Sequence, residues 1–448
     1  MELKIAFTDK EITPWGGMVL LKNMLDQIDF KKVISNCPQL PKPGSNRGYS
    51  PVQIIESFIV SIWCGANRFF HTEVTRHDRT LNRIFNWERS PGNDTYKRFF
   101  SKFTQAINQR IFQYFYQWFF TQLKFDNLTL DLDSTIITRY GNQEGATKGY
   151  NRKKPGRHSH HPLIAFVADC LMVANCWLRS GDAHTSNNFL SFLEDTLNKL
   201  KDKHVSLVRL DSGFYDKKIF EYLEQKGLSY IVSAKLYSLI QRKIHAQRSW
   251  LKLDEGVEIA ETMYRNPFWD KPRRLIIIRR RIELKKGSQS IGKQLTLFKD
   301  EEIYDNYRYS CFITNLTLSA ADVWRLYRQR AQAENRIKEL KYDFGSCPVA
   351  RRVSSFNLRN FWGTEAALNF AMIAYNLMSL FRQFILNSKT QQRLSTLRYK
   401  TFAIGAYLVK DGRYIVLKLS LALKRREWFT GLWKQSKKFS LPVRFSNA

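Results

Sequence analysis

Three acidic residues lie where metal-dependent chemistry would need them. Asp133 closes one apolar run (LTLDLDST), Asp211 closes another (VRLDSGF), and Glu334 lies on a late predicted helix. A charged carboxylate at the end of a buried strand is costly unless it is compensated, and a divalent cation compensates it well. Three carboxylates supply the oxygen ligands that Mg²⁺ and Mn²⁺ prefer. Two such ions, about 3.5–4 Å apart, would activate an attacking hydroxyl and stabilise the leaving oxygen of a phosphodiester.

The first acidic position has two candidates. Asp131 lies two residues before Asp133 and therefore projects from the same face of the strand. We favour Asp133 as the primary ligand because it lies nearest the strand end. A turn or a helix cap is the alternative for Asp211 taken alone, since Ser-Gly follows it. The coincidence of three acids argues against that alternative.

Four residues on the predicted helix 319–343 share one face. Tyr327, Arg330, Glu334 and Lys341 stand at offsets 0, 3, 7 and 14, which at about 100° per residue place them on a stripe roughly 60° wide. Arg330 would grip phosphate with two hydrogen bonds, Lys341 would add a point charge, and Tyr327 would offer a hydroxyl or a stacking face. The alternative is a solvated helix with an Arg330–Glu334 ion pair.

A flexible cationic segment lies between the first two predicted strands. Glycines at 145, 149 and 156 accompany its basic residues, which are Lys148, Arg152, Lys153, Lys154 and Arg157. Such a segment suits contact with a DNA backbone. His158, His160 and His161 follow it. Because no Cys or His partner stands at zinc-finger spacing, we favour phosphate contact or surface exposure over a zinc site.

Two further places are candidates for DNA contact. Trp269 precedes several arginines and would stack on an unpaired base, although packing of Phe268 and Trp269 in a core is favoured. The turn SPGN at 90–93, with Asp94 as a cap, suggests a helix-turn-helix whose second helix carries Lys97 and Arg98. The alternative is a capped helix in an ordinary bundle.

The elements that would position these residues follow from changes in hydrophobic period. Helical periodicity covers about 1–125, including 51–63 and a long aromatic amphipath at 98–123. Short β-runs follow at 128–133, 163–167, 171–177, 204–210 and 229–234, with helices at 186–200 and 215–226 between the later ones. This βββαβαβ order is that of an α/β ribonuclease H-like core.

The rest of the chain divides by the same criteria. Strands are predicted at 257–264, 274–282 and 309–315, a helix capped by Ser319 and Asp322 runs to about Asp343 before Gly345, and an apolar helix covers 364–386. We therefore expect five parts: a helical DNA-binding domain (1–125), the first part of the catalytic core (126–235), a β-rich insertion (236–318), the catalytic-core helix (319–345) and a basic helical C-terminal region (346–448).

The composition narrows the class of protein. The 448 residues include 72 Lys and Arg against 40 Asp and Glu, a formal net charge of +32, which calls for a polyanionic partner and most simply for nucleic acid. The N-terminus lacks the pattern of a signal peptide, and polar residues interrupt the longest apolar stretches, so we expect neither export nor a membrane span. Six cysteines without CxxC spacing indicate reduced thiols in a cytoplasmic, nucleoid-associated protein.

The spacing of Tyr327, Arg330, Glu334 and Lys341 resembles, without a gap, the Tyr-Arg-Glu-Lys signature of a large branch of bacterial insertion-sequence DDE transposases. Segments 131–135, 141–156, 178–181, 209–213 and 333–343 also resemble those of one subgroup, and the resemblance runs from about 45 to about 420. It departs at Arg152, where the subgroup carries proline. A basic residue there should keep phosphate binding but loosen the turn.

The resemblance implies a ribonuclease H-like catalytic domain interrupted by a β-rich insertion, with Asp133, Asp211 and Glu334 binding two Mg²⁺ or Mn²⁺ ions. Tyr327, Arg330 and Lys341 would position the transposon-end strand. The implied activity is cleavage at terminal inverted repeats and strand transfer into target DNA, with double-stranded DNA as the partner and a homodimer joining two ends. The alternatives are a ribonuclease H-like nuclease, which would need neither these three residues in register nor the insertion, and a transposase-derived DNA-binding protein.

Overall fold

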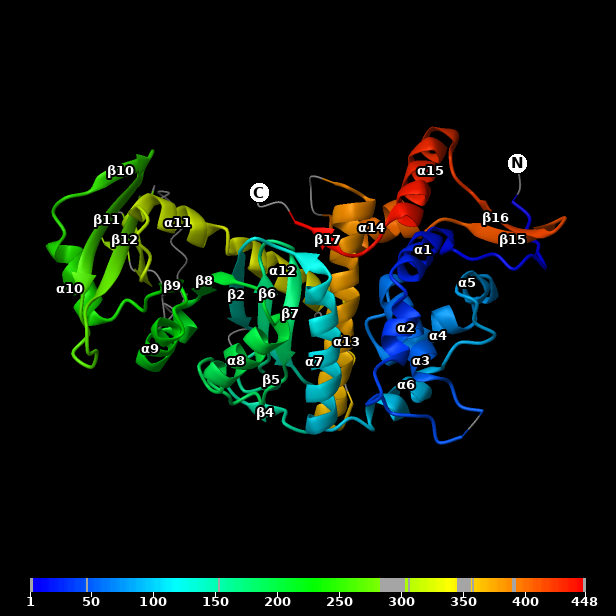
Figure 1. The fold of residues 1–448 in the computed structure, drawn as a ribbon, viewed down its shortest axis with the longest axis horizontal. Coiled ribbons are helices and arrows are strands. Elements are labelled where there is room, and N and C mark those ends of the chain that lie inside the picture. Colours follow the sequence, from blue (N-terminus) through cyan, green and yellow to red (C-terminus); the bar gives the residue numbers. More distant parts are fainter. Residues whose placement is uncertain are drawn as a thin grey trace.

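The structure is a computed structural model that describes residues 3–45, 47–151, 154–282, 303–304, 307–344, 356, 358–388 and 392–445. Figure 1 shows an elongated molecule with three regions. Long helices flank a central sheet, a β-rich extension lies at one end, and the N-terminal helices lie beside a C-terminal hairpin at the other end. Across the described ranges, no helix combines the length and the apolarity that crossing a membrane requires.

The central sheet contains the five strands that the sequence predicts. β2 (Leu128–Ser134), β6 (Leu163–Val167) and β7 (Met172–Trp177) form an antiparallel meander, and β8 (Val205–Leu210) lies parallel to β2 and to β9 (Tyr230–Ser233). The crossovers between parallel strands are α8 (Phe189–Leu200) and α9 (Lys217–Gln225). The spatial order is β7-β6-β2-β8-β9. The predicted βββαβαβ order is confirmed, and this mixed α/β architecture is consistent with a ribonuclease H-like transposase fold.

The β-rich extension continues the same sheet. β9 pairs with β14 (Tyr307–Thr314), which pairs with β12 (Arg273–Arg281); β11 (Val257–Tyr264), β10 (Leu251–Asp254) and the short β13 (Ile303–Tyr304) complete it. α10 (Ser238–Ala246) precedes these strands. The predicted strands of the insertion are therefore present, and the hydrogen bonds between β9 and β14 join them to the core as one ten-stranded sheet.

Two long helices lie side by side next to the meander (Figure 1). α7 (Gln105–Thr121) contacts α13 (Phe361–Leu380), and α13 also packs on β7. Every residue of α13 from Gly363 to Leu380 is buried, and the helix continues through a π-turn, Phe381–Ile385. A helix that is apolar on all sides belongs in a protein core. The predicted apolar helix at 364–386 is confirmed.

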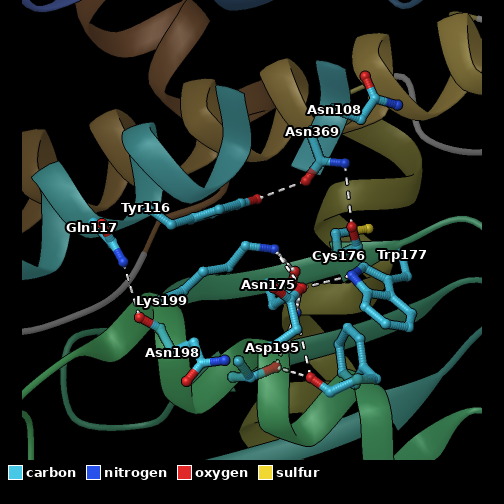
Figure 2. Close-up of polar contacts among 12 residues, drawn as sticks. Asn108, Tyr116, Gln117, Asn175, Cys176, Trp177, Asp195, Asn198, Lys199 and Asn369 are labelled. Atoms are coloured by element: carbon cyan, nitrogen blue, oxygen red, sulfur yellow. Dashed lines mark hydrogen bonds and ion pairs between the residues drawn. The ribbon is translucent and has the colours of Figure 1, made fainter. Parts of the chain in front are cut away.

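Buried polar contacts hold these helices against the sheet (Figure 2). The Lys199 ammonium of α8 donates to Asn175 Oδ1 (2.7 Å) and to Asp195 Oδ2 (2.6 Å). Nearby, Asn369 Nδ2 of α13 donates to the Cys176 carbonyl oxygen (3.2 Å), and the Tyr116 hydroxyl of α7 donates to Asn369 Oδ1 (3.1 Å). These contacts pair buried donors of the helices with acceptors on β7 and on the neighbouring helices, as burial of polar groups requires.

Glu365 on α13 makes folding stability depend on pH. Burial raises its pKa to about 7, although the side chain of Asn108 (2.8 Å) and the amide of Leu178 (3.0 Å) donate to its carboxylate. The native protein then keeps a proton that the unfolded chain releases. The free energy of unfolding should therefore fall as pH rises from about 4.5 to about 7. Glu365→Gln should flatten this part of the thermal-unfolding curve, and an unchanged slope in the variant would contradict the assignment.

The N-terminal region is helical, as predicted. Its helices, besides α7 and two 3₁₀ turns (Gly16–Met18 and Phe69–His71), are α1 (Val19–Gln27), α2 (Phe30–Ser35), α3 (Pro51–Trp63), α4 (Thr72–Arg76), α5 (Arg79–Ile84) and α6 (Asn93–Phe100). The predicted amphipath at 98–123 is wrong as one helix. The Thr104 side chain accepts from the Ile107 amide and starts α7 separately from α6.

The C-terminal region is helical only in part, which corrects the prediction for 346–448. After α13 come α14 (Leu394–Leu397) and a second π-turn, Arg398–Phe402. A hairpin of β15 (Ala406–Asp411) and β16 (Tyr414–Leu419) precedes α15 (Leu423–Lys438), and β17 (Val443–Arg444) pairs with β1 (Leu123–Lys124). Two short runs of aromatic, β-branched and leucine residues, 407–409 and 414–417, stand on either side of Asp411-Gly412 and are a hairpin signal that the basic composition concealed.

Candidate active site

The two candidate aspartates lie at the edge of the sheet that is formed by the carboxyl ends of two central strands, β2 and β8. β2 and β8 are parallel, with Asp131 opposite Arg209, so Asp133 and Asp211 lie two residues further along both strands. Asp211 directly follows β8, and its Oδ1 accepts from the Gly213 amide (2.9 Å), which begins a 3₁₀ turn, Ser212–Phe214. The carboxyl ends of neighbouring parallel strands therefore bring both carboxylates to the same place.

The third acid comes from a helix that begins beside these strand ends. The predicted single helix from Ser319 to about Asp343 is wrong: α11 (Ala320–Arg328) and α12 (Ala331–Asp343) are separate helices. The Ser319 cap is confirmed, since its side chain accepts from the Asp322 amide; Gly345 lies outside the described residues. Glu334 is exposed in the first turn of α12.

A buried arginine explains the helix break. Arg209 donates from Nη1 to the carbonyl oxygen of Leu326 (2.5 Å), in the last turn of α11. The amide of Arg330 instead bonds the Tyr327 carbonyl (2.9 Å), three residues back. Arg330 therefore lies at the junction of the two helices, where its Nη2 donates to the Leu132 carbonyl (3.1 Å) and pairs with Asp133 Oδ2 (3.4 Å).

The three carboxylates are electrostatically linked. Burial raises the pKa of Asp133 to about 6; Arg330 opposes the rise, and the negative charges of Asp211 and Glu334 add to it. The pKa of Arg330 is raised despite its burial, because Asp133 and other anionic groups favour its charged form. The site therefore concentrates negative charge that one guanidinium compensates only in part.

These residues fit a divalent cation, although they do not form a finished cage. Within the described ranges, no three Asp, Glu, His or Cys side chains stand close enough together to form a ready-made ion site. The charges of Asp211 and Glu334 nevertheless raise the pKa of Asp133, after burial as the main cause. Glu334 is exposed, so its side chain can change rotamer without repacking a core. The carboxylates of Asp211 and Glu334 disfavour the charged form of Asp133, and carboxylate oxygens are the donors that Mg²⁺ or Mn²⁺ would use here.

The structure distinguishes the two aspartates that the sequence left open. Asp131 is buried and accepts two hydrogen bonds from Arg209, at 2.6 Å from Nε and 2.8 Å from Nη2. Both of its oxygens are thus engaged with one guanidinium. Asp133 has a longer contact to Arg330 and faces the other acids. This favours Asp133 as a ligand and gives Asp131 a structural role.

Sequence analysis missed Arg209 as a component of the site. The signal was present: both strands end on the same pattern, Asp131-Leu-Asp133 and Arg209-Leu-Asp211. In parallel strands of equal register, such a repeat places an opposite-charge pair directly before a pair of acids. A search for matching charge patterns at predicted strand ends would have found it.

The other two residues of the signature also lie near the strand ends. The Tyr327 hydroxyl donates to the carbonyl oxygen of Leu210 (3.3 Å), directly before Asp211, and its ring packs on Phe312 with centroids 4.4 Å apart. Lys341 is half-buried on α12, and its charge is one of the causes that lower the pKa of His161, after burial and Arg179. All four signature residues therefore face the same edge despite the helix break.

The cationic segment forms part of a small sheet next to this edge. β3 (Ile137–Thr138), β5 (His158–His160) and β4 (Thr147–Lys148) pair in that order. Lys148 and Arg157 are exposed, and the Lys154 ammonium lies 4.8 Å from the ring centroid of Tyr140. Arg152 and Lys153 lie outside the described residues. DNA contact by this segment stays a prediction.

The expected exposure of the histidines is wrong for two of the three. His158 is exposed, but His160 and His161 are buried. His160 accepts at Nδ1 from Arg139 (2.9 Å) and donates from Nε2 to the Glu144 carbonyl (2.9 Å). Burial, with Arg139 as the second cause, lowers the pKa of His160 to about 3, so its ring is neutral and structural.

The remaining DNA-contact candidates divide by exposure. Trp269 is 4% exposed and packs among the rings of Tyr215, Phe220 and Tyr264, which favours core packing over base stacking. Its neighbour Phe268 is 82% exposed, against the expectation that both pack in a core.

Lys97 and Arg98 are exposed on α6. That helix begins at Asn93, two residues before the predicted start at Thr95, because the Glu73 carboxylate of α4 accepts from the Asn93 amide (2.6 Å). Asp94 is therefore in the first turn and is not the cap. The role of Lys97 and Arg98 in binding DNA stays a prediction.

A mixed sheet with acids gathered at the carboxyl ends of its central strands is typical of enzymes that transfer phosphoryl groups between nucleic-acid strands. The family model "Transposase DDE domain group 1" matches residues 1–439, and the chain belongs to this family of DDE transposases. Among solved structures, the chain is similar to a piggyBac transposase in a synaptic complex with hairpin DNA, at 10% sequence identity and a TM-score of 0.45, over 86% of this chain and 79% of that one. A search of curated proteins finds no significant match.

Proposed function

We propose that this transposase cleaves DNA strands at the terminal inverted repeats of a transposon and joins the exposed 3′ ends to target DNA. The observation that carries the proposal is that Asp133 and Asp211 lie at the carboxyl ends of neighbouring parallel strands. The charge of Glu334 also contributes to the raised pKa of Asp133. Membership of the DDE family supports the same chemistry. The core that holds these residues is proposed to be of the ribonuclease H type.

Asp133, Asp211 and Glu334 would hold the divalent ions, two Mg²⁺ or Mn²⁺, which supply Lewis-acid stabilisation when bound. Arg330 would keep the Asp133 carboxylate in place and also contact the DNA. Among the described contacts its buried Nε has no hydrogen-bond partner, so a donor remains for a phosphate oxygen. Lys341 would extend this positive stripe along α12, and Tyr327 would fix the end of β8 through Leu210.

DNA is the proposed partner, with two copies of the chain joining two transposon ends. The net charge of +32 supports strong backbone binding, which should weaken steeply as salt rises. Lys148, at the end of β4, and Lys154 and Arg157, in the loop that joins β4 to β5, are proposed to follow the backbone beside the acidic edge; Lys148 and Arg157 are exposed and Lys154 is half-buried.

The test is incubation of the purified protein with labelled candidate transposon ends, with and without a target duplex, in Mg²⁺ and in EDTA. The expected products are nicked ends that require Mg²⁺ and joined products that also require the target. Metal-dependent cleavage without joining would favour a nuclease. Specific binding without either product would favour a DNA-binding protein that has lost catalysis.

A further inference from the structure

One segment of the chain packs against the residues that directly follow the carboxyl ends of β2 and β8, near Asp133 and Asp211. It follows β7 and runs from Arg179 to Asn187, before α8. The buried Arg179 guanidinium donates from Nη1 to the carbonyl oxygens of His184 (2.9 Å), Thr185 (3.3 Å) and Asn187 (2.7 Å). Its Nε donates to the carbonyl of His161 (2.9 Å). We name residues 179–187 the strap, because one side chain fixes its course.

The strap orients His161 toward the end of β2. The carbonyl oxygen of Ala183 can only accept, so the 2.9 Å contact to His161 Nδ1 places the ring proton on Nδ1. His161 Nε2 then accepts from the Ser134 hydroxyl at 3.1 Å. The backbone amide of Ser134 donates to Asp133 Oδ1 at 2.7 Å. The ring therefore holds the residue that directly contacts the Asp133 carboxylate.

The strap also contacts Gly213, whose amide donates to the second carboxylate, that of Asp211. Thr185 Oγ1 lies 3.4 Å from Ser134 Oγ. Its Cγ2 methyl lies against Gly213, where a Cβ would come within 2.9 Å of it. The Gly213 amide donates to Asp211 Oδ1. Thr185 thus lies between the partners of Asp133 and Asp211.

The outer side of the strap is fixed as well. The backbone of Ser180 forms an isolated antiparallel β-bridge with His160 on β5. Gly181 lies so close to the small sheet that a Cβ there would lie 2.1 Å from the Ser159 carbonyl oxygen. Gly149 approaches from the other side, since its Cβ would lie 1.9 Å from the Gly181 carbonyl oxygen. Tight backbone packing on this side leaves the strap little room to move away from the acids.

We propose that His161 and Thr185 are positioning residues that set the placement of the Asp133 and Asp211 carboxylates for divalent-metal binding. This inference rests on the proposed function, because it assumes that these carboxylates hold the ion. Neither side chain acts on DNA directly. Removing a group that orients the ligands of a metal typically lowers its affinity by about 10–100-fold.

The test compares His161→Phe with His161→Gln. Phenylalanine fills the space but can neither donate to Ala183 nor accept from Ser134, whereas glutamine can do both. His161→Phe is expected to raise the Mn²⁺ concentration for half-saturation by about 10–100-fold, measured by equilibrium titration without DNA, and His161→Gln to restore most of the affinity. DNA-end binding in EDTA should stay unchanged in both. His204→Phe, an exposed histidine at the start of β8, is the matched control.

A second pair of variants keeps the test decisive should His161→Phe fold poorly. Ser134→Ala removes the hydroxyl that His161 accepts from, and it should raise the same Mn²⁺ requirement. The double variant Ser134→Ala/His161→Gln should bind Mn²⁺ about as weakly as Ser134→Ala alone, because both lack the same hydrogen bond between residues 134 and 161. Thr185→Val should weaken Mn²⁺ binding more than Thr185→Ser does.

Wild-type Mn²⁺ affinity in Ser134→Ala and in a folded His161→Phe would overturn the positioning role alone. A wild-type protein that neither binds Mn²⁺ nor cleaves would overturn the proposed function with it.

Discussion

Replacing Asp211 with asparagine is expected to lower strand cleavage at a labelled transposon end by about 10³-fold or more. A bound divalent ion lowers such a barrier by several kcal/mol, and about 1.4 kcal/mol corresponds to a factor of ten in rate. The neutral amide is a poor ligand for Mg²⁺, yet its Oδ1 can still accept from the Gly213 amide, so the turn after β8 should persist. Glu334→Gln, in the exposed first turn of α12, should behave in the same way.

The control for this prediction lies five residues further along. Asp216 caps α9 by accepting from the Lys218 amide (2.9 Å), just as Asp211 caps its own turn. Asp216→Asn therefore makes the same chemical change at a cap outside the proposed site, and cleavage should be unaffected. Gel-shift binding to the DNA end in EDTA should be similar for both variants. Wild-type cleavage by Asp211→Asn would rule out this set of ligands.

The strands of the core were predictable because their burial leaves a clear pattern. β6 is buried along its whole length and β2 at most positions, so both appear as short apolar runs that end at polar residues. An acid that ends such a run is therefore expected at the end of a strand. Asp133 and Asp211 could thus be found at strand ends from local sequence alone.

The division of α11 from α12 was not predictable in this way. Local propensity favours helix through Gln329 and Arg330, and both helices were expected as one. The break depends on Arg209, which comes from a strand more than a hundred residues earlier and takes the carbonyl of Leu326. A tertiary hydrogen bond of this kind leaves no mark on the helix sequence itself.

The exposure of His160 and His161 was predicted wrongly for a related reason. His160 and His161 follow a run of glycines and basic residues, which indicates a solvated loop. Their burial comes from the strap and from α13, with Arg179 and Phe361 packed nearby. Composition near a residue predicts its exposure only when no distant segment returns to cover it.

Asp131→Asn should lower the stability of the protein much more than Asp133→Asn does, and the contrast tests which of the two aspartates is structural. Asp131→Asn leaves the Arg209 guanidinium, which is 2% exposed, without its counter-charge. Breaking a buried pair by removing one partner costs about 3–5 kcal/mol. In a region of this size the thermal midpoint in EDTA should fall by about 5–20 °C. Asp133→Asn should lower it little, because burial and neighbouring acids already disfavour that charge.

A double variant separates the loss of the pair from the damage of leaving one charge alone. Asp131→Val combined with Arg209→Met replaces both partners with apolar side chains, and such replacements are often near neutral in stability. The midpoint should therefore recover much of what Asp131→Asn loses, although the Leu326 carbonyl also loses its donor. An Asp131→Asn protein as stable as the wild type would instead mean that Asp131 is not held in this pair, and the assignment of Asp133 as the ligand would lose its main structural support.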